Sequence, residues 1–145
     1  MIIRPRRLRK SPSVRDMVRE TTLSVKDFIC PLFVKQGSGR KDPIPSMPGQ
    51  YQFSPDTLIK EVEELWSMGI PAIILFGLPD AKDAEGSSSL ADDGIVQISV
   101  SAIKNHLPDM VVITDVCLCE YTDHGHCGVI REGRVDNDAT LELLA

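Results

Sequence analysis

Two helix-like segments are each followed by a short apolar run, and this alternation restricts the chain to an α/β fold with a parallel sheet. The first segment begins at Ser54-Pro55, where serine suits the N-cap and proline the first helical position. Its apolar residues recur at helical spacing, at Leu58, Val62 and Leu65. Gly69 follows the last turn, and residues 70–76 then predict a strand that is buried on both faces.

The second helix-like segment, residues 94–106, has apolar residues that fit both strand and helix spacing. We favour a helix, because two parallel strands need a crossover between them. Asp92 or Asp93 can cap its start, and Pro108 marks its end. Residues 110–116 then predict a further strand that is parallel to the one before it.

An earlier apolar run, residues 28–34, is interrupted by Pro31. Proline cannot donate a hydrogen bond within a sheet, so we expect the residues after it to form the first strand. Two polar stretches, residues 35–51 and 80–93, are too long to be tight turns. We expect them to be loops at the mouth of the fold, the end of the sheet where an active site can lie.

Three smaller elements are predicted near the ends of the chain. Residues 13–20 predict a short helix whose first residue, a serine, is the N-cap. A small hairpin is predicted to turn at Glu132-Gly133. Asp136 or Asn137 can then cap a final helix.

A group of sulfur and carboxylate side chains follows the strand at residues 110–116. Because strand side chains alternate, Asp115, Cys117 and Cys119 would share one face if the strand stayed extended that far. The next residues, Asp-His-Gly-His-Cys-Gly, are typical of a turn that brings Cys127 back toward the other two sulfurs.

Three cysteines with this spacing suit a single soft or borderline cation such as Zn²⁺. Three protein ligands leave one coordination position open, as in catalytic zinc sites, whereas His124 or His126 as a fourth ligand would close a structural site. The alternatives are three buried reduced cysteines or a disulfide, with the histidines in a polar turn. The fourth cysteine, Cys30, lies in an apolar run and is expected to fill the core.

Charge is distributed unevenly along the 145 residues, whose formal net charge is −5. The first fifteen residues hold six basic side chains and no acidic one, so the rest carries eleven net negative charges. The acidic average argues against non-specific nucleic-acid binding, and we expect the basic arm either to pack on an acidic neighbour or to be a solvated tail. No apolar stretch is long enough to span a membrane and no signal peptide is evident, so we expect a cytoplasmic protein that uses its cysteines for metal.

The cysteine-containing stretch resembles the metal-binding signature of the porphobilinogen synthase family, also called 5-aminolevulinate dehydratase. The resemblance extends along nearly the whole chain. It includes Asp115-Val-Cys-Leu-Cys-Glu-Tyr-Thr-x-His-Gly-His-Cys-Gly128, Ser46-Met-Pro-Gly49, Leu75-Phe-Gly-x-Pro79, Lys82-Asp83 and Asn137-Asp-x-Thr-Leu141.

The resemblance implies a TIM (β/α)8 barrel, which needs ~250 residues. We therefore expect a basic N-terminal arm with a short helix at residues 1–25, and about the first three β/α units of an incomplete barrel at residues 26–145. The final helix shows no C-cap glycine, which suggests that the chain is the first part of a longer enzyme. In the family, the arm wraps around a neighbouring subunit, so a homo-oligomer is expected.

Enzymes of this family are lyases that condense two molecules of 5-aminolevulinate to porphobilinogen, with loss of water, in haem and other tetrapyrrole biosynthesis. The resemblance assigns the zinc to Cys117, Cys119 and Cys127 and places Asp115 close to substrate, although this carboxylate could instead only orient the site. His126 matches a position that binds a second, peripheral zinc in some members, and a simple turn histidine is the alternative.

The family's two Schiff-base lysines lie on later strands, so none is expected in this chain. Lys35 is the only lysine expected near the mouth, and we interpret it as a solvated loop residue. Two hypotheses follow. The chain is the zinc-binding part of a zinc-dependent dehydratase and is inactive alone, or it is a non-catalytic zinc-binding or oligomerisation module.

Overall fold

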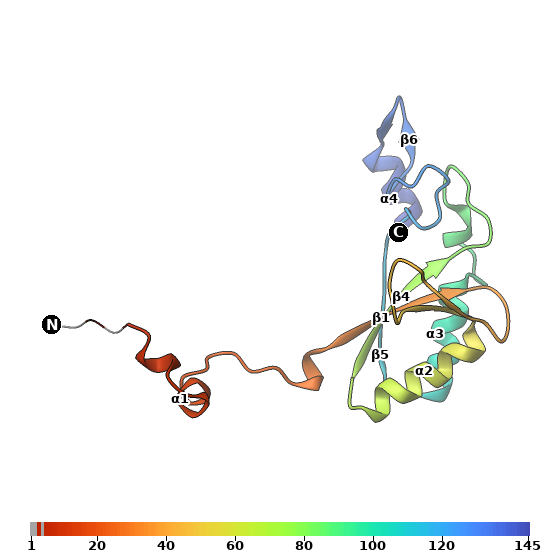
Figure 1. The fold of residues 1–145 in the computed structure, drawn as a ribbon. Coiled ribbons are helices and arrows are strands. Elements are labelled where there is room, and N and C mark those ends of the chain that lie inside the picture. Colours follow the sequence, from red (N-terminus) through yellow and green to blue (C-terminus); the bar gives the residue numbers. More distant parts are fainter. Residues whose placement is uncertain (1–2, 4) are drawn as a thin grey trace.

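Three parallel strands form the centre of the protein in the computed structural model, which describes residue 3 and residues 5–145. β1 (Ile29–Lys35) pairs with β4 (Ala72–Leu78), and β4 pairs with β5 (Val111–Thr114). Two short strands, β2 (Lys41–Pro43) and β3 (Tyr51–Phe53), extend the sheet beyond β1, in the order β2-β3-β1-β4-β5. The helices α2 (Pro55–Ser67) and α3 (Ile95–His106) lie side by side against this sheet (Figure 1). The alternation of helix and strand therefore predicted the central sheet correctly.

The other helices and strands lie before, between and after these three strands, and α2 and α3 are the longest of them. In chain order they are η1 (Arg7–Arg9), α1 (Pro12–Met17), η2 (Val25–Asp27), β2 (Lys41–Pro43), β3 (Tyr51–Phe53), α2 (Pro55–Ser67), η3 (Ser87–Ser89), α3 (Ile95–His106), β6 (Ile130–Arg131), β7 (Arg134–Val135) and α4 (Asn137–Leu144). No helix among the described residues has the length and apolar character needed to cross a membrane.

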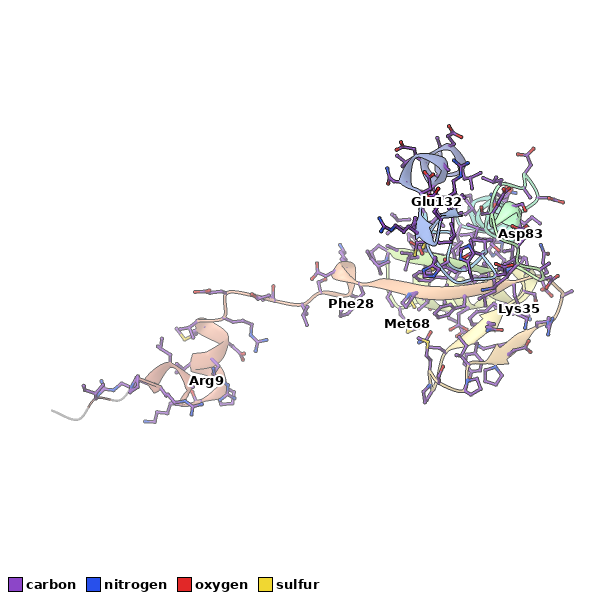
Figure 2. All side chains as sticks on the ribbon, turned by 90° about the horizontal axis from the view of Figure 1, so that it is seen from above. Arg9, Phe28, Lys35, Met68, Asp83 and Glu132 are labelled. Carbon is purple, nitrogen blue, oxygen red and sulfur yellow. The ribbon has the colours of Figure 1, made fainter. Side chains whose placement is uncertain are left out.

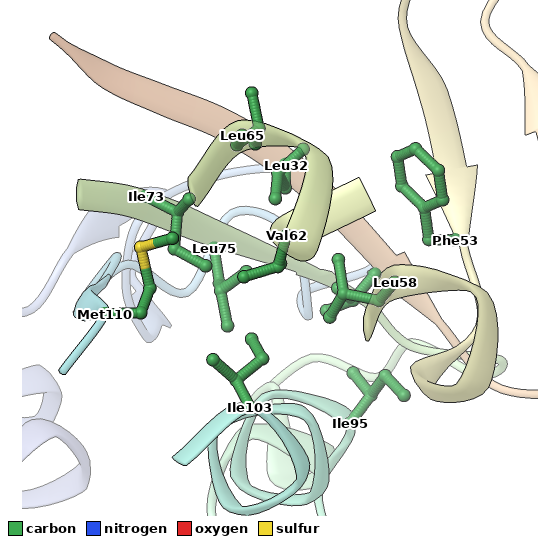
Figure 3. Close-up of a cluster of buried hydrophobic side chains, with 11 residues drawn as sticks. Leu32, Phe53, Leu58, Val62, Leu65, Ile73, Leu75, Ile95, Ile103 and Met110 are labelled. Carbon is green, nitrogen blue, oxygen red and sulfur yellow. The ribbon is translucent and has the colours of Figure 1, made fainter. Parts of the chain in front are cut away.

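The hydrophobic core lies between the sheet and the α2–α3 layer (Figure 3). Val62 from α2, Leu75 from β4 and Ile103 from α3 are fully buried there. Leu58, Val62 and Leu65, which were predicted on the apolar face of α2, are all buried because that face packs on the strands. Gly69 ends α2 with a φ of +85°, which glycine adopts without steric cost.

β1 includes Pro31, so the strand begins before the proline and the expected start after it is wrong. Along its whole length β1 pairs with β4, whereas β3 reaches only Phe33 and Val34. The proline therefore lies where β1 has a described neighbour on one side only, a position where its missing N–H costs little. Lys35, which was expected in the following loop, is the last residue of the strand.

The stretch predicted as one long loop after β1 contains β2 and β3. These three-residue strands pair antiparallel to each other, and β3 runs parallel to β1. Strands this short have too few residues to show an alternating pattern in the sequence.

The helix starts differ in two places from those expected. α1 begins two residues earlier than predicted, since Ser11 rather than Ser13 is its N-cap and accepts a hydrogen bond from Val14 N at 3.3 Å. α3 is confirmed as a helix, but Gly94 is its N-cap instead of Asp92 or Asp93.

The C-terminal elements match the prediction. Glu132 and Gly133 have φ values of +51° and +75° between β6 and β7, as a tight two-residue hairpin turn requires. Asp136 caps α4 by accepting a hydrogen bond from Ala139 N at 3.0 Å.

The segment before β1 extends away from the sheet (Figures 1 and 2). Figure 2 shows Arg9 at the far end of this segment and Phe28 where it meets the sheet. Several apolar side chains of the segment are exposed, among them Leu8, Met17 and Leu23. Arg4 of the basic stretch, with residues 1 and 2, lies outside the described residues.

Candidate metal centre

The cysteines follow the end of β5 in a loop and not along an extended strand. The strand ends at Thr114, and the amides of Tyr121 and Thr122 both donate to Leu118 O at 2.9 Å. This tight turn buries Leu118. The condition for one shared strand face is therefore not met, because the backbone leaves the sheet before the first cysteine.

The turn nevertheless brings together the three sulfurs that the sequence singled out. The Sγ atoms of Cys117, Cys119 and Cys127 all lie within 4.8 Å of one another, and Cys117 Sγ and Cys119 Sγ are 3.3 Å apart. All four cysteines of the chain are free thiols. Tetrahedral zinc with Zn–S bonds of about 2.3 Å needs sulfurs separated by roughly 3.8 Å, so the cluster has the right dimensions for one such ion.

The protonation of the thiols also fits a cation site. The hydrogen bond with Cys117 and burial raise the pKa of Cys119 above its usual range, and contact with Cys117 raises the pKa of Cys127. Sulfurs this close disfavour thiolates, because negative charges would repel each other. A divalent cation reverses that preference, since metal binding deprotonates coordinating thiols.

Two carboxyl groups lie beside the sulfurs. Asp115, Cys117 and Glu120 bring ligand atoms within 4.8 Å of one another, and Cys119 Sγ donates to Glu120 Oε2 at 3.2 Å. Burial and the neighbouring Glu120 raise the pKa of the Asp115 carboxyl group. Glu120 was not predicted as a site residue from the sequence, although its position next to Cys119 in a turn was a signal.

Neither histidine of the loop belongs to the sulfur cluster. Among the described residues, two groups bring three potential ligand atoms within 4.8 Å, and both consist of cysteine and carboxylate side chains. His126 is exposed, and its ring centroid is 5.5 Å from that of His124. His124 accepts a hydrogen bond from His126 N at Nδ1 and lies 3.1 Å from Ala84 O through Nε2.

Tyr121 fastens the loop to the sheet. Its side chain is 9% exposed, and burial raises the pKa of its hydroxyl group. Its hydroxyl oxygen lies against Gly77 near the carboxyl end of β4, where a Cβ atom would overlap Tyr121 Oη and approach Val96 Cγ2 to 2.7 Å. Gly77 is therefore the residue that makes room for this tyrosine.

A cavity of about 630 Å³ lies next to Cys117, one of the three cysteines of the cluster. Thr114, Asp115 and Cys117 line it from the end of β5, and Val100 lines it from α3. This volume accommodates a small organic molecule beside the Asp115 carboxyl group.

The lysine expected near the mouth does not point freely into solvent. Lys35 Nζ lies 2.8 Å from Asp42 Oδ2 and 3.2 Å from Gln52 Oε1, and its side chain is 18% exposed. The interpretation as a solvated loop lysine is wrong, since β2 and β3 cover one side of it.

Comparison with known proteins supports the resemblance seen in the sequence. The sequence profile of the family described as "Delta-aminolevulinic acid dehydratase" matches residues 2–145. A delta-aminolevulinic acid dehydratase of Halalkalibacterium halodurans is 55% identical over 142 residues, covering 98% of this chain and 43% of the relative. One from Bacillus subtilis is 51% identical over 142 residues, with 98% and 44% coverage. The chain thus spans less than half the length of these relatives.

Solved structures give the same result. The crystal structure of the Toxoplasma gondii delta-aminolevulinic acid dehydratase (porphobilinogen synthase), in complex with the reaction product porphobilinogen, superposes with a TM-score of 0.92 and 39% sequence identity. The match covers 99% of this chain and 42% of that one. With a family profile that matches almost the whole sequence, this chain belongs to the delta-aminolevulinic acid dehydratase family.

Proposed function

We propose that the intact protein is a zinc-dependent porphobilinogen synthase, and that this chain supplies the metal-binding part of its active site. The observation that carries the proposal is the convergence of three sulfurs beside Asp115 at the carboxyl end of β5. In barrel enzymes this is the end of the strands where active sites lie. Membership of the family then points to the condensation of two 5-aminolevulinate molecules.

The proposed zinc ligands are Cys117, Cys119 and Cys127. Their sulfur atoms bind zinc more favourably than they bind harder cations. A bound zinc ion would supply a Lewis acid with one open position for the substrate's carbonyl or amino group. His126 is exposed next to Cys127 and is the proposed ligand of a second, peripheral ion.

Asp115 is the proposed catalytic residue of this chain. Its raised carboxyl pKa means that it holds a proton more readily than an ordinary aspartate. In the cavity next to Cys117 it can therefore orient a substrate ammonium group when ionised, or give and take a proton at a reacting atom.

The Schiff-base chemistry of the reaction must come from other residues. Among the described residues, Lys35 is paired with Asp42, and Lys104 Nζ donates to Met110 O at 2.6 Å on the outside of α3. Neither amine faces the sulfur cluster as a desolvated nucleophile would. We therefore propose that the 145 residues alone are inactive.

We further propose that β1, β4 and β5 are the first three strands of a (β/α)8 barrel that begins near residue 26. The segment up to residue 25 would be an arm that holds a second copy of the protein in a cytoplasmic homo-oligomer. Its exposed apolar residues, such as Met17 and Leu23, and its basic side chains support a role in contact with the acidic remainder of another copy.

Pyrrole formation from 5-aminolevulinate tests the proposal. The intact protein should be active, lose activity with a zinc chelator and regain it with Zn²⁺, while the 145-residue chain should be inactive. Asp115→Asn should lower kcat without lowering zinc content, whereas Cys119→Ser should lower both. An intact protein that folds and binds zinc but forms no pyrrole would contradict the enzymatic assignment. Turnover by the 145-residue chain would contradict the proposal that the Schiff-base residues lie outside it.

A further inference from the structure

The loop between β4 and α3 lies directly against the cysteine-containing loop. Asp83 and Thr122 form an isolated parallel bridge, in which Asp83 N donates to Tyr121 O at 3.4 Å and Asp123 N donates to Asp83 O at 3.0 Å. Two loops that are about forty residues apart in sequence are thereby joined by backbone hydrogen bonds at the middle of the turn.

His124 makes a second connection between the same loops, farther along the turn. Its Nε2 atom is 3.1 Å from Ala84 O, and its Nδ1 atom is 3.1 Å from His126 N. A carbonyl oxygen can only accept and a backbone N–H can only donate, so the proton sits on Nε2 and the lone pair on Nδ1. Both ring nitrogens are therefore engaged in hydrogen bonds.

This connection constrains the residues that lead to Cys127. His126 N is held by the His124 ring, and His126 O accepts a hydrogen bond from Thr122 Oγ1 at 2.9 Å. Thr122, which donates this bond, is itself 1% exposed. The residue before Cys127 is thus fixed through both its amide and its carbonyl group.

The partner loop is itself well ordered by Asp83. Its carboxylate accepts hydrogen bonds from Glu85 N at 2.9 Å and from Ser87 N at 3.1 Å, and also from the Ser87 hydroxyl group. Gly86, with a φ of +67°, packs on the cysteine loop, where a Cβ atom would lie 3.2 Å from Tyr121 Cβ. Ala84 O is therefore presented from a turn whose shape is set independently of the histidine.

We propose that His124 is a positioning residue that fastens the cysteine loop to Ala84 O and so holds the Cys127 sulfur beside Cys117 and Cys119. It acts through hydrogen bonds and is not a metal ligand. The inference concerns the site of the proposed function and rests on that function only for its metal-binding readout.

Three variants separate the two hydrogen bonds of the ring. His124→Gln can still donate to Ala84 O, but it has no acceptor atom at the position of Nδ1 and so loses the bond from His126 N. His124→Asn can accept from His126 N but is too short to reach Ala84 O. His124→Ala loses both bonds. His106→Ala is the matched control, because His106 is an exposed histidine on α3 that pairs with Glu63 away from this loop.

Zinc affinity of the intact protein, measured by competition with a chromophoric chelator, is the first readout. We expect His124→Ala and His124→Asn to bind Zn²⁺ about tenfold more weakly, as is typical when a group that orients metal ligands is lost. His124→Gln and His106→Ala should stay within about twofold of the wild type. X-ray absorption is measured at one zinc ion per chain in a His126→Ala background, which removes the proposed peripheral ligand. It should show the same sulfur ligands and no imidazole whether residue 124 is histidine or alanine.

Amide hydrogen exchange in the metal-free protein is a second readout that needs no metal. Exchange at Asp123 and His126 should become faster in His124→Ala, and in His124→Gln the Asp123 amide, which bonds to the partner loop, should keep its protection. Unchanged zinc affinity and unchanged exchange in His124→Ala would overturn the proposal, as would an imidazole in the zinc coordination sphere of His126→Ala that disappears when His124→Ala is added. A wild type that binds no zinc, with faster exchange in His124→Ala, would support the positioning role and contradict the proposed function instead.

Discussion

At the scale of single residues, the position of the cysteine loop depends on the space above Gly77. Gly77→Ala should push the Tyr121 ring away from β4, because a Cβ atom would overlap Tyr121 Oη and approach Val96 Cγ2 to 2.7 Å. Overpacking of this kind costs about 1–3 kcal/mol in the free energy of unfolding. Urea denaturation would measure the loss.

A double-mutant cycle assigns this loss to the tyrosine. Tyr121→Phe removes the overlapping hydroxyl group, so adding it to Gly77→Ala should recover part of the stability. If the two substitutions are simply additive, the hydroxyl group of Tyr121 is not what the new Cβ atom meets.

Thr140 performs a comparable role for the segment after the cysteines. Its Oγ1 atom accepts a hydrogen bond from Val129 N at 3.0 Å and donates to Asp136 O at 2.6 Å, and the residue is 6% exposed. Thr140→Val has the same shape but leaves the Val129 amide without its partner. We expect a loss of about 1–3 kcal/mol in the free energy of unfolding by thermal or urea denaturation.

Thr140→Ser is the control for this substitution, since it keeps the hydroxyl group and removes a methyl group. It should be more stable than Thr140→Val. The reverse order would mean that the buried methyl group, rather than the hydrogen bond to Val129 N, stabilises this segment.

Individual site residues could be predicted where their chemistry is distinctive. Cys117, Cys119 and Cys127 stood out by their spacing, and the structure brings their sulfurs together. Glu120 did not stand out, because a single carboxylate gives no signal until the turn at Leu118 places it against Cys119. The hydrogen bonds of His124 depend on a loop forty residues away, which no local pattern reveals.

At the scale of helices and strands, the elements with strong end signals were predicted well. α2 has proline at its first position and Gly69 after its end, and the hairpin has Gly133 in its turn. These signals act within a few residues and need no tertiary context. β5 is shorter than the predicted strand at residues 110–116. The prediction extended to Val116 because that residue is also apolar, but the pairing of β5 with β4 ends at Thr114.

The start of α2 supplies a pH-dependent contribution to stability. Hydrogen bonds from the Ser54 hydroxyl group at 2.5 Å and from Gly39 N at 2.7 Å lower the pKa of the Asp56 carboxyl group to about 2. An Asp with a lowered pKa stabilises the fold fully above its unfolded pKa near 4, and this contribution is lost as the pH falls toward 2.

Asp56→Asn should therefore reduce the free energy of unfolding at pH 6 and converge with the wild type near pH 2. Urea denaturation across this range measures both curves. Asp83 also has a lowered pKa, so the wild type and the variant will both lose stability on acidification, and the difference between them reports Asp56. A constant difference from pH 6 to pH 2 would contradict the assignment.

At the scale of the whole molecule, the sheet has an edge that the described residues leave uncovered. β5 is the last strand of the order β2-β3-β1-β4-β5, and Val111 on it is 50% exposed. An open parallel edge with apolar side chains invites pairing with another chain. This exposure could not be predicted from local patterns, since 110–116 resembles a strand that is buried on both faces.

We expect the isolated 145-residue chain to self-associate through this edge, with a mass that rises with concentration in sedimentation velocity. Val111→Lys should reduce the association, because a charged side chain opposes pairing at a strand edge. The arm is the competing surface, and Met17, which is 86% exposed on α1, provides its test. If Met17→Lys disperses the chain and Val111→Lys does not, the arm drives association and the uncovered edge of β5 does not.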